Sequence, residues 1–283
     1  TRSTSVPART ILPLIGKGTE MLALVLAAVL TASDEEAYRQ ILAADDAMMQ
    51  QPAPRSWSQQ ANYRARLRRI EADYKHFVAT HPDYAPGLAT YASFLYDQNR
   101  HEEAVALWER ALTIDPKFAR AYNDLATHYG HYGRAADALR YHQKAFELDP
   151  TDPVFHYNWA TTCILFRPDA RQVYGWTEDE IFRHSLDEFR KARDVAPTEY
   201  QYATAYAESF VLWPKADWNE ALDAWQYCLK VAPTELDRQR VCSNIARVYL
   251  KLGRVDEARK WLDKITAEEL QSLRQALARR LAQ

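Results

Sequence analysis

Apolar residues recur three and four positions apart along most of the chain, which is the spacing of an amphipathic helix. Breaks that contain proline or glycine divide this pattern into segments of helical length. Only 7 residues are glycine, whereas the helix-forming residues Ala, Leu, Arg and Glu are abundant. The pattern therefore predicts an all-helical fold.

Two helices are predicted ahead of the most regular part of the chain. Ser33 and Glu36 form a capping box that predicts a helix ending at the sequence QQPAP. Ser56 and Gln59 form a second capping box, which predicts a longer helix to about Thr80. Together they indicate a degenerate helical hairpin over residues 34–83.

Beyond this hairpin the sequence repeats itself. The prolines that end helices are spaced by 34, 34, 47 and 36 residues, at Pro82, Pro116, Pro150, Pro197 and Pro233. Small residues keep nearly the same phase on the first helix of each repeat, at Ala92, Ala126, Ala160, Ala207 and Ala246. A second column falls on the second helices, at Ala104, Ala138, Ser185, Ala221 and Ala258. Small residues at such points allow two helices to approach closely.

Bulky side chains accompany the small ones. Trp108, Phe189 and Trp225 recur at one position of the second helices, where His142 is a departure. Gly133 and Gly253 mark the turn inside two of the hairpins. Residues 84–265 therefore predict five helix-turn-helix units.

The period of 34, the small columns, the aromatic columns and the terminal prolines resemble the tetratricopeptide repeat (TPR) family. The resemblance covers residues 84–265. It implies a right-handed α-solenoid of antiparallel helix hairpins, a TPR-like superhelix, with a groove lined by the first helices. It implies no particular chemistry, because many functions share this fold. At the far end, Thr266 and Glu269 predict the start of a C-terminal capping helix over residues 266–283, with Arg274, Arg279 and Arg280 on its exposed face.

The third repeat contains an insertion. Its proline spacing is 47 instead of 34, so 13 extra residues fall near residues 164–177. Because Thr177 and Glu180 form a capping box for the next helix, the insertion is predicted to be a lengthened hairpin turn. Its side chains Arg171, Tyr174 and Trp176 either reach a partner or pack over the end of the hairpin.

The N-terminal residues 1–33 predict a signal peptide. The run MLALVLAAVLTAS is too short to cross a bilayer, follows Arg2, Arg9 and Lys17, and ends in small residues that suit cleavage near Ala32 or Ser33. Export to the periplasm or the extracellular space is therefore expected. A membrane anchor over residues 11–32 is the alternative, although burying Lys17 and Glu20 costs roughly 2.5 to 3.5 kcal/mol per charge; a cytoplasmic location is a further one.

Charge argues against a general nucleic-acid binder. The formal net charge is −2, whereas neutralising phosphates requires an excess of basic residues. One local basic run, Arg64, Arg66, Arg68 and Arg69, is interpreted as the solvated face of a helix.

The sequence contains no motif for catalysis, a cofactor or a metal. There is no P-loop, GxSxG or HExxH motif. His128 and His131 have no further ligand at a suitable spacing, and Cys163, Cys228 and Cys242 lie in apolar contexts with no zinc spacing. We therefore expect no enzymatic activity, no cofactor, no metal and no small-molecule substrate.

The predicted groove is the remaining candidate site. Residues four apart on the first helices should face it, and the resulting set is polar with few charges. Its members are Ser93, Asn123, Thr127, Tyr157, Thr161, Thr204, Glu208, Ser243 and Arg247, with Ala89 beside Ser93. Such a surface suits a peptide. The family's clamp for a terminal carboxylate is missing, because Thr127 stands where a second Asn is expected and no Lys lies on these positions.

The sequence thus predicts a non-catalytic scaffold that binds a protein or peptide partner, in the cell envelope. An accessory subunit of an enzyme complex and a self-assembling structural array remain as alternatives, and the oligomeric state is left open.

Overall fold

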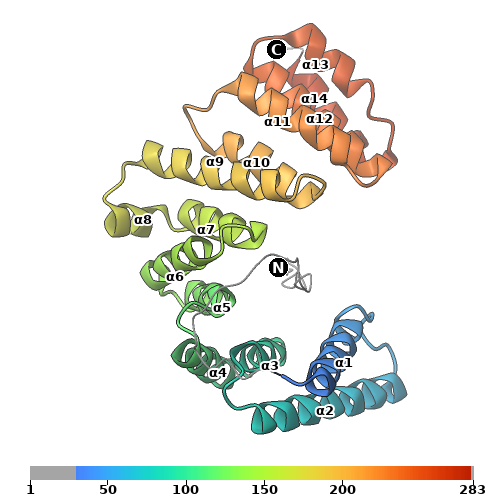
Figure 1. The fold of residues 1–283 in the computed structure, drawn as a ribbon. Helices are drawn as coiled ribbons and strands as arrows, with labels where there is room; N and C mark the ends of the chain where they lie inside the picture. Colours follow the sequence, from blue (N-terminus) through green and yellow to red (C-terminus); the bar gives the residue numbers. More distant parts are fainter. Residues whose placement is uncertain (1–29, 282–283) are drawn as a thin grey trace. The chain divides into compact units, whose positions relative to one another are not determined.

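A computed structural model describes residues 30–281 of the chain, and this part is all helical (Figure 1). The helices are α1 (Ala32–Met49), α2 (Trp57–Thr80), α3 (Ala85–Asp97), α4 (His101–Ile114), α5 (Ala119–His131), α6 (Ala135–Leu148), α7 (Pro153–Leu165), α8 (Arg167–Tyr174), α9 (Glu178–Val195), α10 (Tyr200–Leu212), α11 (Trp218–Val231), α12 (Glu235–Lys251), α13 (Val255–Leu262), the short 3-10 helix η1 (Glu268–Leu270) and α14 (Gln271–Arg280). The helices divide between two compact units, of which the first ends at Ala121 and the second begins at Tyr122. Each unit is described by itself.

The first unit opens with the hairpin of α1 and α2. Ser56 and Gln59 form the capping box that was predicted at the start of α2. The prediction that Ser33 and Glu36 form the capping box of α1 was wrong, because Thr31 and Asp34 form it. Thr31 Oγ1 accepts from the Asp34 backbone N–H, and Ser33 already lies inside the helix.

Small residues bring α3 and α4 together in the first unit. Ala89, Ala92, Ala104 and Ala111 are fully buried between the two helices and their neighbours. The indole Nε1–H of Trp108 donates to the Ala89 backbone carbonyl at 3.2 Å, so the aromatic residue of the second helix is fixed to the first. The small and aromatic columns of the sequence therefore mark the helix contacts.

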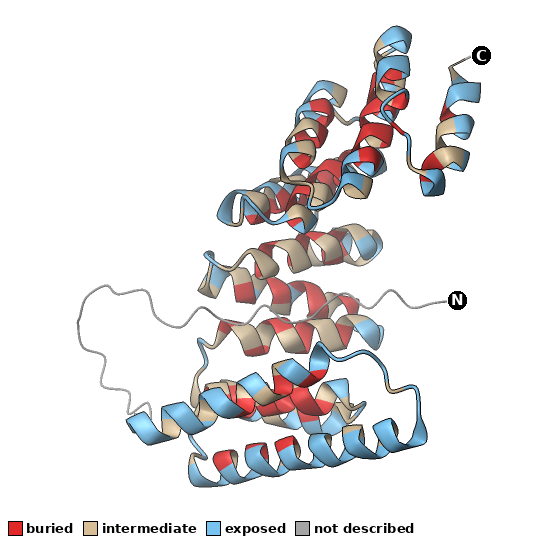
Figure 2. Cartoon of the chain, turned by 90° about the vertical axis from the view of Figure 1, so that its right-hand side faces the viewer, coloured by how far each residue is buried: buried red, intermediate tan, exposed pale blue. Residues whose placement is uncertain are grey.

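The second unit contains four hairpins, built from α5 and α6, α7 and α9, α10 and α11, and α12 and α13. Its buried residues lie between the helices, whereas the outer faces are exposed (Figure 2). The turns inside two hairpins place Gly133 and Gly253 at φ values of 74° and 72°, and the first unit has Asn99 at 60° in the same place. Such φ values favour Gly and Asn, which explains the glycines predicted to mark these turns.

The insertion in the third repeat is a helix, so the prediction of a simple lengthened turn was wrong. Pro168 lies in the first turn of α8, where its missing N–H is no loss, and Gly175 follows the last residue of the helix with φ at 69°. Ala170 on α8 is fully buried. The predicted capping box of Thr177 and Glu180 is present at the start of α9.

The inserted helix is fixed to the second unit by aromatic contacts. Tyr174 and Trp176 stack with ring centroids 4.4 Å apart, and Trp176 stacks on His184 at 4.0 Å. Trp159 Nε1–H donates to the Tyr174 hydroxyl at 3.0 Å, and that hydroxyl donates to the Leu139 carbonyl at 3.2 Å. Tyr174 and Trp176 therefore pack over the end of the hairpin.

The C-terminal helix begins later than predicted. Neither Thr266 nor Glu269 caps it, because the chain first forms η1 and α14 starts at Gln271. The side-chain carbonyl of Gln239 accepts from the backbone N–H groups of Thr266 and Ala267, both at 2.8 Å. A distant glutamine on α12 thus replaces the local cap.

Replacing Tyr174 with Phe should destabilise the second unit by about 1–3 kcal/mol, because the Trp159 indole and the Leu139 carbonyl would both lose a buried hydrogen-bond partner. Urea unfolding followed by far-UV circular dichroism measures the difference. Tyr132→Phe is the matched control, since the Tyr132 side chain is exposed. Equal effects of the two substitutions would contradict the assigned role of Tyr174.

Candidate binding surface

The residues predicted to line the groove lie on first helices in both units. Ser93 and Ala89 belong to α3 in the first unit. The second unit carries the other eight, which are Asn123 and Thr127 on α5, Tyr157 and Thr161 on α7, Thr204 and Glu208 on α10, and Ser243 and Arg247 on α12. We call the surface formed by these four helices of the second unit the first-helix face.

Most hydroxyl groups of the predicted set are engaged by their own helices. Ser93, Thr127, Thr204 and Ser243 each donate to a backbone carbonyl three or four residues earlier, at 2.7 to 3.1 Å. Such bonds are common for Ser and Thr inside helices. A partner would therefore meet these hydroxyls mainly as hydrogen-bond acceptors, and Ser243, at 2% exposure, offers it almost no surface.

Two asparagines connect neighbouring first helices. Asn158 Nδ2–H on α7 donates to Asn123 Oδ1 on α5 at 2.8 Å, and Asn123 Nδ2–H donates to Asp124 Oδ1 at 3.2 Å. Asn123 is buried, whereas Asn158 is half-buried. The sequence reasoning missed Asn158, because it considered only pairs of residues four apart and Asn158 stands one place after Tyr157.

The other predicted side chains are partly occupied. The Tyr157 ring packs edge-on against Phe189 and Tyr202, at centroid distances of 5.8 and 5.7 Å. Arg247 donates to the side-chain oxygen of Asn244 at 3.0 Å. Glu208 is exposed on α10, yet desolvation by neighbouring groups raises the pKa of its carboxyl above the usual value. It is the one acidic group in the predicted set.

Exposed apolar side chains lie in the last turns of two adjacent first helices, and the sequence did not predict them as site residues. Leu165 in the last turn of α7 is 69% exposed, and Val211 and Leu212 in the last turn of α10 are 62% and 54% exposed. Leu165 follows Thr161 by four residues and Leu212 follows Glu208 by four, so they share the first-helix face. Three large apolar side chains left in water on one face are typical of an interaction site.

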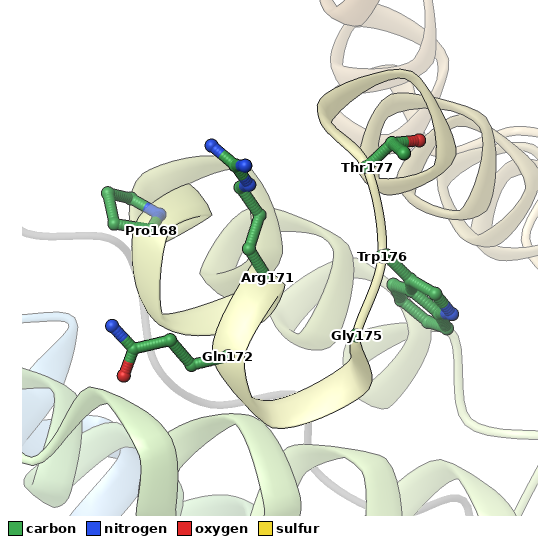
Figure 3. A pocket seen from close by; sticks show the side chains of 6 residues that line it. All are labelled: Pro168, Arg171, Gln172, Gly175, Trp176 and Thr177. Carbon is green, nitrogen blue, oxygen red and sulfur yellow. The ribbon is translucent and has the colours of Figure 1, made fainter.

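The insertion carries a shallow depression, which Figure 3 shows from close by. It is lined by Pro168, Arg171, Gln172, Gly175, Trp176 and Thr177. The side chains of Arg171 and Gln172 point outward in different directions and do not converge on one point (Figure 3). Of the three predicted insertion residues, only Arg171 is exposed.

Away from the first-helix face, the second unit contains a buried charged cluster. His156 Nδ1 lies 2.5 Å from Glu188 Oε2, and its Nε2 lies 2.9 Å from the Pro150 carbonyl oxygen. Both neighbours are acceptors, so the imidazole donates from both nitrogens and is positively charged. Lys191 Nζ adds a second donor to Glu188 at 2.7 Å. The cluster joins α7 and α9 to the loop that precedes α7.

The surroundings shift the pKa of both members of this pair. Burial alone would lower the pKa of His156, but the hydrogen bonds to Glu188 and Pro150 raise it above the ordinary value. Burial alone would raise the pKa of Glu188, but the bonds from His156 and Lys191 lower it. Each charge therefore stabilises the other.

His142 on α6 has the opposite environment. It is fully enclosed, which lowers its pKa to about 3, and its Nδ1 has no hydrogen-bond partner in the described part of the chain. It is therefore a neutral imidazole at the position where other repeats carry Trp or Phe.

Within residues 30–281 no three His, Cys, Asp or Glu side chains are grouped so as to hold a metal ion. Cys163, Cys228 and Cys242 are buried free thiols whose pKa values are raised by that burial. No helix in this range is both long and apolar enough to cross a membrane.

Comparisons with known proteins agree with the repeat pattern. A family model described as TPR repeat matches residues 93–130, and another described as tetratricopeptide repeat matches residues 215–281. No curated protein matches the sequence.

Solved structures resemble the chain in fold. YrrB, described as a TPR protein with an unusual peptide-binding site, aligns with a TM-score of 0.58 at 16% identity, covering 73% of this chain and 97% of its own. PilF of Pseudomonas aeruginosa aligns with a TM-score of 0.58 at 13% identity, covering 85% and 93%. PilW, described as a widely conserved type IV pilus biogenesis factor, aligns with a TM-score of 0.57 at 13% identity, covering 86% and 99%.

Two segments of the chain therefore match TPR repeats, and the described part of the chain has the all-helical fold of TPR solenoids. This fold is of the protein-interaction type. At such low identities the structural likenesses show the fold alone.

The two histidines should give the protein opposite pH dependences. The pKa of His156 is raised on folding, so its contribution to stability is complete below about pH 6.5 and is lost as the pH rises through the raised pKa. The pKa of His142 is lowered to about 3, so the unfolded chain takes up a proton that the folded chain does not, and stability falls below about pH 6.5.

Substitution of each histidine separates these effects in urea unfolding at pH 5, 6, 8 and 9. His142→Phe should raise the free energy of unfolding, by about 2 kcal/mol more at pH 5 than at pH 8. His156→Gln should lower it by about 3 kcal/mol near pH 6, and this loss should shrink toward pH 9. Differences that stay constant across the pH range would refute both assignments.

Proposed function

We propose that this protein is a non-catalytic scaffold that binds a protein or peptide partner on the first-helix face of its second unit. The observation that carries the proposal is the exposure of three large apolar side chains, Leu165, Val211 and Leu212, in the last turns of two adjacent first helices. Burying apolar side chains of this size contributes about 1.5–3 kcal/mol each. The fold supports the proposal because its packed hairpins keep the face preformed, so little ordering is required when a partner docks.

The polar groups of this face suit an extended or helical peptide. Half-buried Thr127 on α5 and Asn158 and Thr161 on α7 provide hydroxyl and amide groups on the same first helices. Hydrogen bonds from such groups fix the register of a peptide, and the apolar side chains give it affinity. Glu208 and Arg247 provide one charge of each sign at exposed positions, which favours no strongly charged partner.

We further propose that the protein works in the cell envelope after export. The support is the sequence of residues 1–33, most of which lies outside the described residues. PilF and PilW share the fold, and the description of PilW as a pilus biogenesis factor is compatible with this location.

Selection of a random peptide library on the purified protein tests the binding face. Val211→Asp should weaken the selected peptides by about tenfold or more, because a carboxylate would replace an apolar contact. Val195→Asp is the matched control, since Val195 is 43% exposed at the end of a second helix. If Val211→Asp and Val195→Asp weaken peptide binding equally, the peptides bind elsewhere. If Asn158→Ala and Leu165→Asp also leave peptide affinity unchanged, the proposal is overturned.

Export is tested by fusing residues 1–33 to a reporter enzyme that becomes active only in an oxidising compartment outside the cytoplasm. Activity is expected, because a basic start followed by an apolar run directs secretion. A charge placed in the apolar run, Leu24→Arg, should abolish the activity. An inactive fusion, retained in the cytoplasm, would contradict the prediction that residues 1–33 are a signal peptide.

A further inference from the structure

The segment over residues 55–70 is the most basic part of the chain. These 16 residues contain five arginines and neither Asp nor Glu, in a chain whose formal net charge is −2. The remainder of the protein is therefore net acidic, at −7. The arginines are Arg55, Arg64, Arg66, Arg68 and Arg69.

The structure places this segment on the outside of the first unit. Helix α2 packs through Ile70, Tyr74 and Phe77, which lie in its second half. Its first half is mostly exposed, as the long helix at the bottom of Figure 2 shows. All five arginines are exposed. The basic segment therefore covers about four turns of a helix with few packing partners.

These arginines also lack the ion pairs that several arginines form elsewhere in the protein. None of the five forms an ion pair with a carboxylate in the described part of the chain, whereas Arg100, Arg134 and Arg240 each pair with an acid three residues away. The acid nearest to the segment on α2, Glu71, already binds Arg100 Nη1 at 2.5 Å and Lys75 Nζ at 2.8 Å. Asp73 is the one exposed acid that follows. The positive charge is therefore left for an external partner.

A large aromatic side chain lies at the end of the same face. Trp57, the first residue of α2, is 90% exposed. Arg64, Arg68 and Lys75 follow it at intervals of seven, four and seven residues, so the four side chains share one face of the helix, away from Tyr74 and its buried neighbours. Met49 at the end of α1 is 49% exposed. The α2 face consists of Trp57, Arg64, Arg68 and Lys75.

We propose that the α2 face binds the surface of an anionic phospholipid membrane, with α2 lying along it. A helix of 24 residues is about 36 Å long, so cations and tryptophan can meet the headgroups together. Arginine and lysine near an anionic leaflet each gain about 1 kcal/mol, which is about fivefold in partition. The indole of tryptophan prefers the membrane interface, where its ring is in the apolar boundary and its N–H in water.

The exposed tryptophan favours a membrane over an acidic protein, because cations alone would serve both equally. The net charge of −2 of the whole chain argues against nucleic acid. This membrane contact is independent of the proposed partner binding. It involves residues of the first unit only, whereas the proposed partner binding involves residues of the second unit.

Co-sedimentation of the full chain with vesicles tests the proposal. The vesicles contain either phosphatidylcholine alone or phosphatidylcholine with roughly 30% of the anionic lipid phosphatidylglycerol. The second composition imitates the negative surface of an anionic leaflet. The protein should bind the anionic vesicles more tightly, and added salt should weaken that binding. The quadruple variant with Arg64, Arg66, Arg68 and Arg69 changed to Gln should lose about 25-fold or more in partition, because Arg64 and Arg68 lie on the α2 face and each contributes about fivefold.

Controls separate the α2 face from net charge and from folding. A second quadruple variant, Arg254→Gln, Arg259→Gln, Arg279→Gln and Arg280→Gln, makes the same charge change at exposed positions of the second unit and should bind like the wild type. Trp57→Ser touches no buried group and should reduce anionic binding by about tenfold. Both α2 variants should keep the wild-type circular dichroism spectrum.

Three results would overturn the proposal. The first is equal binding of the α2 quadruple variant and the wild type to anionic vesicles. The second is equal binding of the wild type to neutral and anionic vesicles, which would assign attachment to the apolar N-terminal run. The third is arginine-dependent binding to a single-stranded oligonucleotide or to polyglutamate without binding to vesicles.

Discussion

Close approach of helices through small residues is the constraint on which this structure depends. A single helical hairpin cannot bury its own apolar face, so each repeat is stable only against its neighbours. Ala126, Ala160, Ala207 and Ala246 are all fully buried, which lets large side chains such as Trp225 fill the space beside them. Substituting any of these alanines with a larger residue would separate two helices and weaken the contacts on both sides.

The same constraint determines where variation is tolerated. The insertion lies between α7 and α9, yet these helices still pack against each other, because α8 leaves the hairpin contact intact and adds its own buried Ala170. The inserted helix has become part of the core through Tyr174. The stacking leaves the exposed positions of the first helices and of α2 unused, and these are the two places where we propose that the protein binds.

Polar groups inside the second unit show how the fold accommodates departures from its pattern. His156 is buried, but its two ring nitrogens donate to the Glu188 carboxylate and to the Pro150 carbonyl. Its positive charge therefore holds α7, α9 and a loop together. His142 occurs in an apolar site and remains neutral, which costs stability but not the fold. One residue type thus has opposite electrostatic roles within neighbouring helices.

The sequence by itself determined the helices, their pairing and the repeat, because the period of small and aromatic residues reflects contacts between neighbours in sequence. It also located Asn123 and Tyr157 on first helices. It did not reveal the Asn158 bond, the helical form of the insertion or the glutamine cap from Gln239, since each depends on groups distant in sequence. Only the tertiary structure decided that Leu165, Val211, Leu212 and Trp57 are exposed. A helical pattern predicts that such apolar residues are buried, and the pattern does not show whether another helix covers them.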